Sequence, residues 1–282
     1  MDVDHQLNPI PERLYHYTNL ESLALILTNR TIRLMPLTGV DDPQEQRAID
    51  VRNIGKFVFI SCWTDDPEES IPMWNMYASL DAGVRISLPP MPFKRYSLTH
   101  EEYAKAVGMD PSHISSESGR CESFMDPHDL ANGLVSPSYL TGEDVLTRVE
   151  YTDESCKLVP EIVSVDGDSL EVRTGLIGAY KNRYWAFRRE WRYKMQIVPF
   201  NVLDMSSNPV DRFNEMIFHM VNGALPSPCP YYDLMLDENA LRCIEVVPSP
   251  KMSAGNRELL NLLLEKHGLS FALQSSQSEG LL

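Results

Sequence analysis

The stretch RLYHYT, residues 13–18, runs directly into NLESLALIL, residues 19–27, and this junction decides the start of the fold. Aromatic residues crowd the first segment, and apolar residues in the second recur at the three- and four-residue spacing of a helix. Thr18 and Glu21 have the spacing of a capping box, in which each side chain satisfies a free N–H group at the helix start. The junction therefore predicts a strand that ends at a helix N-terminus.

His16 is the first candidate functional residue because of this junction. A helix N-terminus offers free N–H groups and the positive end of a dipole to a phosphate. A histidine just before it is well placed to bind a ribose or a diphosphate. The alternative is that His16 forms hydrogen bonds within the fold, and the stretch alone favours neither interpretation decisively.

The composition is that of an ordinary globular protein. The 282 residues are 43% hydrophobic and 23% charged, so the chain is long enough for a sizeable core. The formal net charge of −15 repels nucleic-acid phosphates on average, so we expect no broad non-specific DNA binding, although a local basic groove is compatible with it.

The sequence has no feature of an exported or membrane-spanning protein. The acidic start is not followed by an apolar run, and no apolar stretch is long enough to cross a bilayer. The 5 cysteines are scattered and never form a Cys-x-x-Cys pair, which indicates reduced thiols and no zinc site. We expect a cytoplasmic protein without a metal centre or a membrane partner.

Several apolar runs predict strands. Residues 32–37 and 83–88 are limited by prolines, residues 57–63 combine β-branched and aromatic side chains, and residues 243–247 stop at Pro248. The run 57–63 has the composition of a buried central strand.

Helical spacing predicts helices from about residue 70, over 169–184 and over 257–266. Asp42 and Pro43 predict a further helix start, with Asp42 as the N-cap and Pro43 at the first helical position. The inward residues of the last helix are expected to be Leu259, Leu260, Leu263 and Leu264.

Residues from about 93 to 144 are the least strand-like part of the chain. The segment holds a helical run at 101–107 and a Ser-rich, acidic stretch at 113–122. We interpret it as a helical and loop insertion, able to carry substrate choice, within a single domain that covers residues 1–282.

Residues 189–195 alternate large side chains with charged ones, as a strand with two different faces does. Trp191, Tyr193 and Met195 would lie on one face, and Glu190, Arg192 and Lys194 on the other. A strand that lines a cleft with a carboxylate and two cations has this pattern, and so does an ordinary strand with one face at the surface.

Seven different short motifs are spread over nearly the whole chain. They are LYHYT at 14–18, DPQE at 42–45, ISCW at 60–63, MWNMYA at 73–78, GV at 83–84, WAFRREWR at 185–192 and VVPSPK at 246–251. Together they resemble a bacterial family of uncharacterised proteins, marked by Tyr-His-Tyr-Thr, Asp-Pro-x-Glu and Met-Trp-x-x-Tyr-Ala. Members of that family are often met beside defence or toxin genes.

The order of the motifs is also distantly similar to ADP-ribosyltransferases of the His-Tyr-Glu class, which includes diphtheria-toxin-like and poly-ADP-ribose-polymerase-like enzymes. In that class a histidine holds a ribose of NAD, a tyrosine stacks on nicotinamide, and a glutamate stabilises an oxocarbenium ion. The resemblance assigns these roles to His16, Tyr77 and Glu190. The further residues that it places around NAD are Tyr15, Tyr17, Thr18, Ser61, Trp74 and Arg192.

Two positions depart from that class. Tyr17 stands where many members have glycine, so the approach of the cofactor to this backbone differs. Arg188 stands where arginine-modifying transferases often carry a second acidic residue, which argues against modification of protein arginines.

The sequence therefore predicts a single α+β domain, a split twisted mixed sheet with packed helices, that carries an NAD-dependent ADP-ribosyltransferase-like site. NAD is the expected substrate, and the acceptor is expected to be a macromolecule, protein or RNA, in a toxin or phage-defence setting with a neutralising partner protein as one option. His16, Tyr77 and Glu190 are expected to line one cleft. The alternatives are a nucleotide-sensing binding module and an NAD-independent nuclease or phosphotransferase that uses the same cleft.

Overall fold

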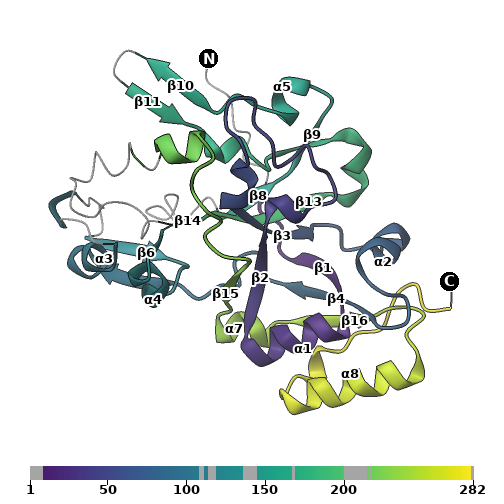
Figure 1. Cartoon of the computed structure of the whole chain (residues 1–282). Helices are drawn as coiled ribbons and strands as arrows, with labels where there is room; N and C mark the ends of the chain where they lie inside the picture. The colour runs from purple at the N-terminus through teal and green to yellow at the C-terminus, as the bar shows by residue number, and fades with distance from the viewer. Residues whose placement is uncertain are drawn as a thin grey trace. The chain divides into compact units, whose positions relative to one another are not determined.

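The computed structural model describes residues 9–107, 111–113, 119–135, 145–166, 169–199, 215 and 217–280 (Figure 1). The chain forms two compact units, each assembled from separate segments of sequence. The first unit comprises Met1–Arg30, Trp63–Pro92 and Glu238–Leu282, and the second comprises Thr31–Cys62 and Phe93–Asp237.

The sheet of the first unit is antiparallel. β1 (Leu14–Asn19) pairs along its whole length with β4 (Gly83–Leu88), and β4 pairs in turn with β16 (Glu245–Pro248). His16 lies opposite Ile86 in this register. The strands expected over 83–88 and near 243–247 are confirmed.

The junction between β1 and α1 (Leu20–Asn29) differs from the expected one. The N-cap of α1 is Asn19, whose side chain accepts a 2.8 Å hydrogen bond from the N–H of Ser22. The capping box of Thr18 and Glu21 is therefore wrong, because pairing with β4 keeps the chain extended through Asn19. His16 accordingly lies within the strand rather than at its end.

Three further helices belong to the first unit: α2 (Ile71–Tyr77), α7 (Glu238–Arg242) and α8 (Ala254–Lys266). α1 and α8 pack against each other, as Figure 1 shows in purple and yellow. α2 begins after Ser70, whose side chain caps it, so the helix start expected near residue 70 is confirmed.

α8 presents Leu260 and Leu264 to the core, and Gly268 follows it with the positive φ that suits glycine after a helix. Leu259 is instead 59% exposed. Its predicted inward position is wrong because the buried face of this helix passes through Leu260 and Leu264, which are four residues apart and so lie on the same side.

The second unit has its own antiparallel strands. β2 (Thr31–Pro36) pairs with β15 (Tyr232–Met235) on one side and with β3 (Val58–Thr64) on the other. β13 (Glu190–Gln196) pairs with β3 and with β8 (Leu146–Arg148). The first five residues of β3 belong to this unit, and the buried strand expected over 57–63 is confirmed.

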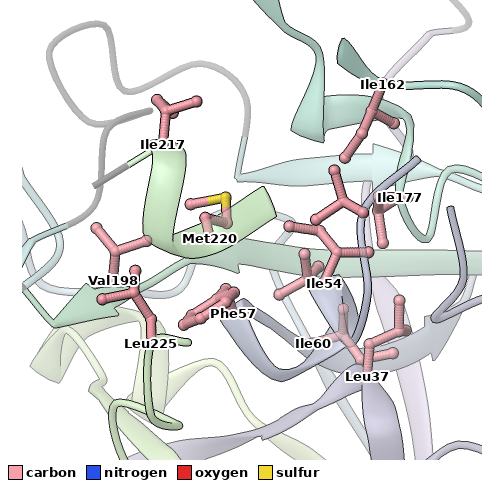
Figure 2. Packing of buried hydrophobic residues seen from close by; sticks show 12 residues of the cluster. Leu37, Ile54, Phe57, Ile60, Ile162, Ile177, Val198, Ile217, Met220 and Leu225 are labelled. Carbon is pink, nitrogen blue, oxygen red and sulfur yellow. The ribbon is translucent and has the colours of Figure 1, made fainter. Parts of the chain in front are cut away.

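The main apolar core of the second unit joins segments that are far apart in the sequence (Figure 2). Its buried members are Leu37, Val51, Ile54, Phe57, Val58, Ile60, Ile162, Ile177, Val198, Ile217, Met220 and Leu225. Burying a side chain of this size contributes roughly 1.5–3 kcal/mol relative to leaving it in water. The cluster therefore holds the dispersed segments of this unit together.

The helix expected over 169–184 is absent from the structure. β11 (Ser169–Val172) pairs with β10 (Val163–Asp166), and β12 (Tyr180–Asn182) pairs in parallel with β9 (Glu150–Thr152). The prediction is wrong because Gly178 adopts a φ of +70°, which a helix does not allow.

The helix expected from Asp42 is also absent. The Asp42 carboxylate instead accepts a 3.0 Å hydrogen bond from the N–H of Gln44, which closes a local turn. An Asp side chain can accept a hydrogen bond from a backbone N–H group two residues later in a turn just as it can at a helix start. At Asp42 it does so in a turn.

The segment from about 93 to 144 is richer in strands than expected. β5 (Tyr96–Thr99) and β6 (Arg120–Ser123) form an antiparallel pair, while α3 (His100–Val107) confirms the helical run at 101–107. Further elements among the described residues of the second unit include α4 (Pro127–Ala131), α5 (Ser155–Leu158) and the paired strands β7 (Leu134–Val135) and β14 (Val198–Pro199). The 3₁₀ turns of the chain include Leu37–Gly39, Ile54–Phe57, Pro111–His113, Thr174–Leu176, Arg183–Arg188 and Ser270–Ala272.

The predicted α+β class is confirmed, with antiparallel pairing dominant in the main strands and several helices packed on them. An ADP-ribosyltransferase-like arrangement and a single domain over the whole chain stay predictions. Over the part of the chain that the structure covers, no helix has the length and apolar character needed to cross a membrane.

Two glycines test the packing of the first unit. A Cβ atom at Gly83 would lie 2.2 Å from the carbonyl oxygen of Ser79, whereas nothing lies within 4 Å of a Cβ atom at Gly255 in α8. We expect Gly83→Ala to lower the free energy of unfolding by about 1–3 kcal/mol. Gly255→Ala should raise it by up to about 1 kcal/mol, because alanine is the better helix former. Urea unfolding of both variants checks this, and an unchanged midpoint for Gly83→Ala would contradict the close contact.

Candidate functional site

Four charged side chains are buried together in the second unit. Glu190 and Arg192 lie on the same face of β13, Lys181 lies in β12, and Glu45 follows the turn at Asp42. Each exposes between 0 and 3% of its surface. We call these four residues, Glu45, Lys181, Glu190 and Arg192, the buried ion cluster.

Within the buried ion cluster, each cation contacts both carboxylates. Lys181 Nζ lies 2.8 Å from Glu45 Oε1 and 3.1 Å from Glu190 Oε2. Arg192 Nε donates a 2.6 Å hydrogen bond to Glu190 Oε1, and Arg192 Nη2 forms an ion pair with Glu45 Oε2. Two positive and two negative side chains thus form a closed, charge-balanced ring.

Backbone groups complete the surroundings of the ring. Arg192 Nη1 donates a 2.8 Å hydrogen bond to the carbonyl of Gly178, and the N–H of Glu190 donates one of 2.9 Å to the Tyr151 hydroxyl. A Cβ atom at Gly178 would lie 3.4 Å from Arg192 Nη1 and 3.1 Å from a Leu37 methyl group. Glycine at this position therefore leaves room for the arginine as well as allowing the backbone conformation.

A further ion pair lies beside the ring. Arg188 Nη2 donates a 2.8 Å hydrogen bond to Asp41 Oδ2, and Arg188 Nη1 lies 3.8 Å from Glu190 Oε2. Glu190 consequently has three cationic side chains within 4 Å of its carboxylate. On the polar face of β13, Glu190 and Arg192 are buried and Lys194 is half-buried, so this face does not lie at the surface as an ordinary surface strand would place it.

The charges of the ring keep Glu190 and Lys181 ionised. Burial raises the pKa of Glu190, but the charges of Arg192 and Lys181 outweigh burial and lower that pKa to about 2. Burial lowers the pKa of Lys181, yet Glu190 and Glu45 raise it above its ordinary value. Burial, with Glu190 nearby, raises the pKa of the Cys62 thiol, so Cys62 stays protonated next to the carboxylate.

The first unit carries the aromatic candidates of β1. Tyr15 and Tyr17 share one face of the strand, where the Arg85 guanidinium lies 4.8 Å from the Tyr15 ring centre and 5.9 Å from that of Tyr17. Alternation along the strand directs His16 to the other face, and its ring lies 5.0 Å from that of Trp63.

Tyr17, Trp74 and Tyr77 belong to one apolar group of the first unit. The rings of Tyr17 and Trp74 meet edge to face at 4.9 Å, and the Tyr17 hydroxyl accepts a 2.9 Å hydrogen bond from the N–H of Ser70. Trp74 is fully buried, so two of the residues expected to contact NAD form core contacts here. Tyr77 is half-buried and packs against this group.

The anion-binding potential expected at the start of α1 is largely used within the protein. The N–H of Leu20 donates a 3.0 Å hydrogen bond to the Ala82 carbonyl, and the N–H of Ser22 donates to Asn19. Glu21 adds a negative charge to the first turn. A diphosphate at this position would have to displace protein acceptors and face that carboxylate.

The remaining candidates are divided between the units. Thr18 is a buried residue of the first unit, and Ser61 is a buried residue of the second unit, as Arg192 is. All three nitrogens of the Arg192 guanidinium contact protein oxygens, so a phosphate ligand would have to replace one of these contacts. A common cleft for His16, Tyr77 and Glu190 stays a prediction.

Two members of the ring were not identified as site residues from the sequence. Lys181 falls in the segment 169–184, for which the sequence predicts a helix, but it lies in β12 and is 1% exposed. Glu45 follows the helix start that the sequence predicts at Asp42, and the motif DPQE at 42–45 is the only signal that includes it. No local pattern announces that these two side chains meet Glu190.

Among the residues of the described ranges, no group of three or more His, Cys, Asp or Glu side chains could hold a metal ion. No family model, no curated protein and no solved structure matches the chain. The chemistry of the site is therefore argued from its own residues.

The lowered pKa of Glu190 predicts a specific loss of stability in acid. Stability from this carboxylate is fully present above its ordinary pKa of 4.5 and is lost as the pH falls through about 2. A shift of this size corresponds to on the order of 3 kcal/mol. Between pH 4.5 and about 2, the free energy of unfolding of the wild type should fall by that amount more than the free energy of unfolding of Glu190→Gln does. Urea titrations at several pH values measure both. Parallel pH profiles for the two proteins would show that the pairing contributes nothing.

Proposed function

We propose that this chain is an NAD-dependent ADP-ribosyltransferase-like enzyme that modifies a macromolecule, either protein or RNA. Glu190 is the proposed catalytic carboxylate, His16 the ribose ligand and Tyr77 the nicotinamide platform. The observation that supports the proposal best is a Glu190 carboxylate kept ionised by Lys181 and Arg192.

Cleavage of the nicotinamide–ribose bond explains why an ionised carboxylate matters. Positive charge develops on the sugar in the transition state and much less in the ground state, so a fixed negative charge aimed there lowers the barrier selectively. A carboxylate with a pKa of about 2 carries that charge at every physiological pH. Cations held beside it fix its position in advance of the reaction.

The setting of the enzyme rests on the resemblance alone. Motifs similar to those of a bacterial family met beside defence and toxin genes support a toxin or phage-defence effector. In that setting a neutralising partner protein belongs to the same proposal.

A second candidate function is a nucleotide-sensing module that breaks no bond. It is favoured by one observation, namely that both Glu190 oxygens already contact cations and that only 2% of the residue is exposed. A carboxylate so engaged presents a weaker negative potential to a substrate than a free one does. In this case Glu190 organises the second unit and takes no part in chemistry.

The test compares the two carboxylates of the ring. Glu190→Gln keeps the shape of the side chain but removes its charge, and we expect nicotinamide release from NAD to fall about a hundredfold or more with NAD affinity little changed. Glu45→Gln is the matched control, because it removes an equally buried negative charge from the same Lys181 and Arg192. Glu45→Gln should lose stability comparably and retain most of its turnover.

Three results would contradict the proposal. Equal turnover of Glu190→Gln and wild type would remove Glu190 from the mechanism. Equal losses in Glu190→Gln and Glu45→Gln would mean that activity follows the stability of the ring. Calorimetric binding of NAD by wild type without any release of nicotinamide would favour the sensing module instead.

A further inference from the structure

The first unit contains a pocket that has no part in the proposed reaction. It lies where the end of α1, the short helix α7 and the residues after α8 come together, and its volume is about 160 Å³. The lining residues are Leu27, Arg30, Glu238, Leu241, Arg242, His267 and Leu269. We call it the α1–α7–α8 pocket.

Three of the lining side chains are nitrogen donors, and they are unequally satisfied. Arg30 Nη1 donates a 2.8 Å hydrogen bond to Glu238 Oε1 at the pocket. Arg242 is exposed, and its side chain forms no hydrogen bond or ion pair with any residue that the structure describes. Nε2 of His267 is buried and likewise lacks a hydrogen-bond partner among the described residues.

An unsatisfied buried nitrogen is unusual, because the large majority of buried polar atoms in folded proteins have a partner. The His267 ring lines the pocket, and a rotation of the ring that opens Nε2 to the pocket would let a ligand oxygen accept the missing hydrogen bond. The two guanidinium groups would receive the same ligand with charge-assisted hydrogen bonds, which are the strong ones. All three donors thus call for an anion with several oxygens.

We propose that the α1–α7–α8 pocket binds the phosphate group of a small phosphate monoester. A tetrahedral phosphate presents oxygens in several directions, so donors from α1, α7 and the end of α8 can contact different oxygens of it. A volume of about 160 Å³ is well below the roughly 300–1,000 Å³ of pockets for drug-sized ligands, so the ligand is far smaller than a dinucleotide. Leu27, Leu241 and Leu269 provide apolar walls for the organic part of the ester.

Glu238 sets the strength of the site. Its carboxylate pairs with Arg30, and it would repel a phosphate that approaches the same guanidinium. Removing the Glu238 charge should therefore tighten binding, whereas removing the Arg242 charge should weaken it. Opposite signs from two exposed residues of one short helix are not expected of a merely structural role.

The experiment titrates the full-length protein with phenyl phosphate and, in parallel, with inorganic phosphate and benzoate near neutral pH. The readouts are calorimetry and the imidazole signal of His267 in a two-dimensional NMR spectrum, assigned by its loss in His267→Gln. Phenyl phosphate should bind more tightly than inorganic phosphate because of the leucine walls, and benzoate should bind weakly. A free phosphate as the physiological ligand would show itself by equal affinities for the ester and the inorganic ion.

The variants separate the pocket from general surface charge. Arg242→Gln should weaken phenyl phosphate binding about tenfold or more, and Glu238→Gln should strengthen it several-fold. Lys266→Gln is the control, since Lys266 adjoins His267 in sequence without lining the pocket, and it should leave affinity nearly unchanged. Equal weakening by Lys266→Gln and Arg242→Gln, no gain in Glu238→Gln, or benzoate binding as tightly as phenyl phosphate would overturn the proposal.

Discussion

The second unit depends on the burial of four formal charges in a ring where every charge touches two of the opposite sign. Transferring such groups from water costs several kcal/mol for each ion, and only closely paired, well-directed contacts offset that cost. Glu45, Lys181, Glu190 and Arg192 meet this condition through contacts that link β12, β13 and the turn after Asp42. Removing one member leaves its partners buried without compensation, which typically costs about 3–5 kcal/mol.

Local patterns were sufficient for the elements whose residues repeat at one period. β4, α2 and β13 lie where their sequences predicted them, because each has a clear apolar alternation, a capping serine or both. The segment 169–184 has a pattern that fits a helix equally well, and there a single glycine with positive φ and pairing with distant strands decided the outcome. Tertiary pairing of this kind overrides local spacing.

Some residues of the candidate site could be predicted from the sequence, but the contacts between them could not. The alternation of Glu190 and Arg192 with aromatic residues correctly placed both on one face of a strand. Glu45 contacts Arg192, which follows it by 147 residues in the sequence (192 − 45), and no motif encodes that contact. Lys181 contacts Glu190 because the chain turns back through the 3₁₀ segment Arg183–Arg188, which the helical pattern does not predict. Tyr17 and Trp74, which the resemblance places around NAD, are instead packed against each other.

The interleaving of the two units along the chain has a consequence for synthesis on the ribosome. β1 and β4 emerge within the first third of the protein, but β16 and α8 belong to the last segment, Glu238–Leu282. Until that segment leaves the exit tunnel, the β16-facing edge of β4 has no strand to pair with, and the apolar side of α1 lacks α8. An open strand edge is a template for aberrant pairing between nascent chains. The first unit begins before the second along this chain and completes its fold after it, so the open edge of β4 is the part of the nascent chain that chaperones need to shield.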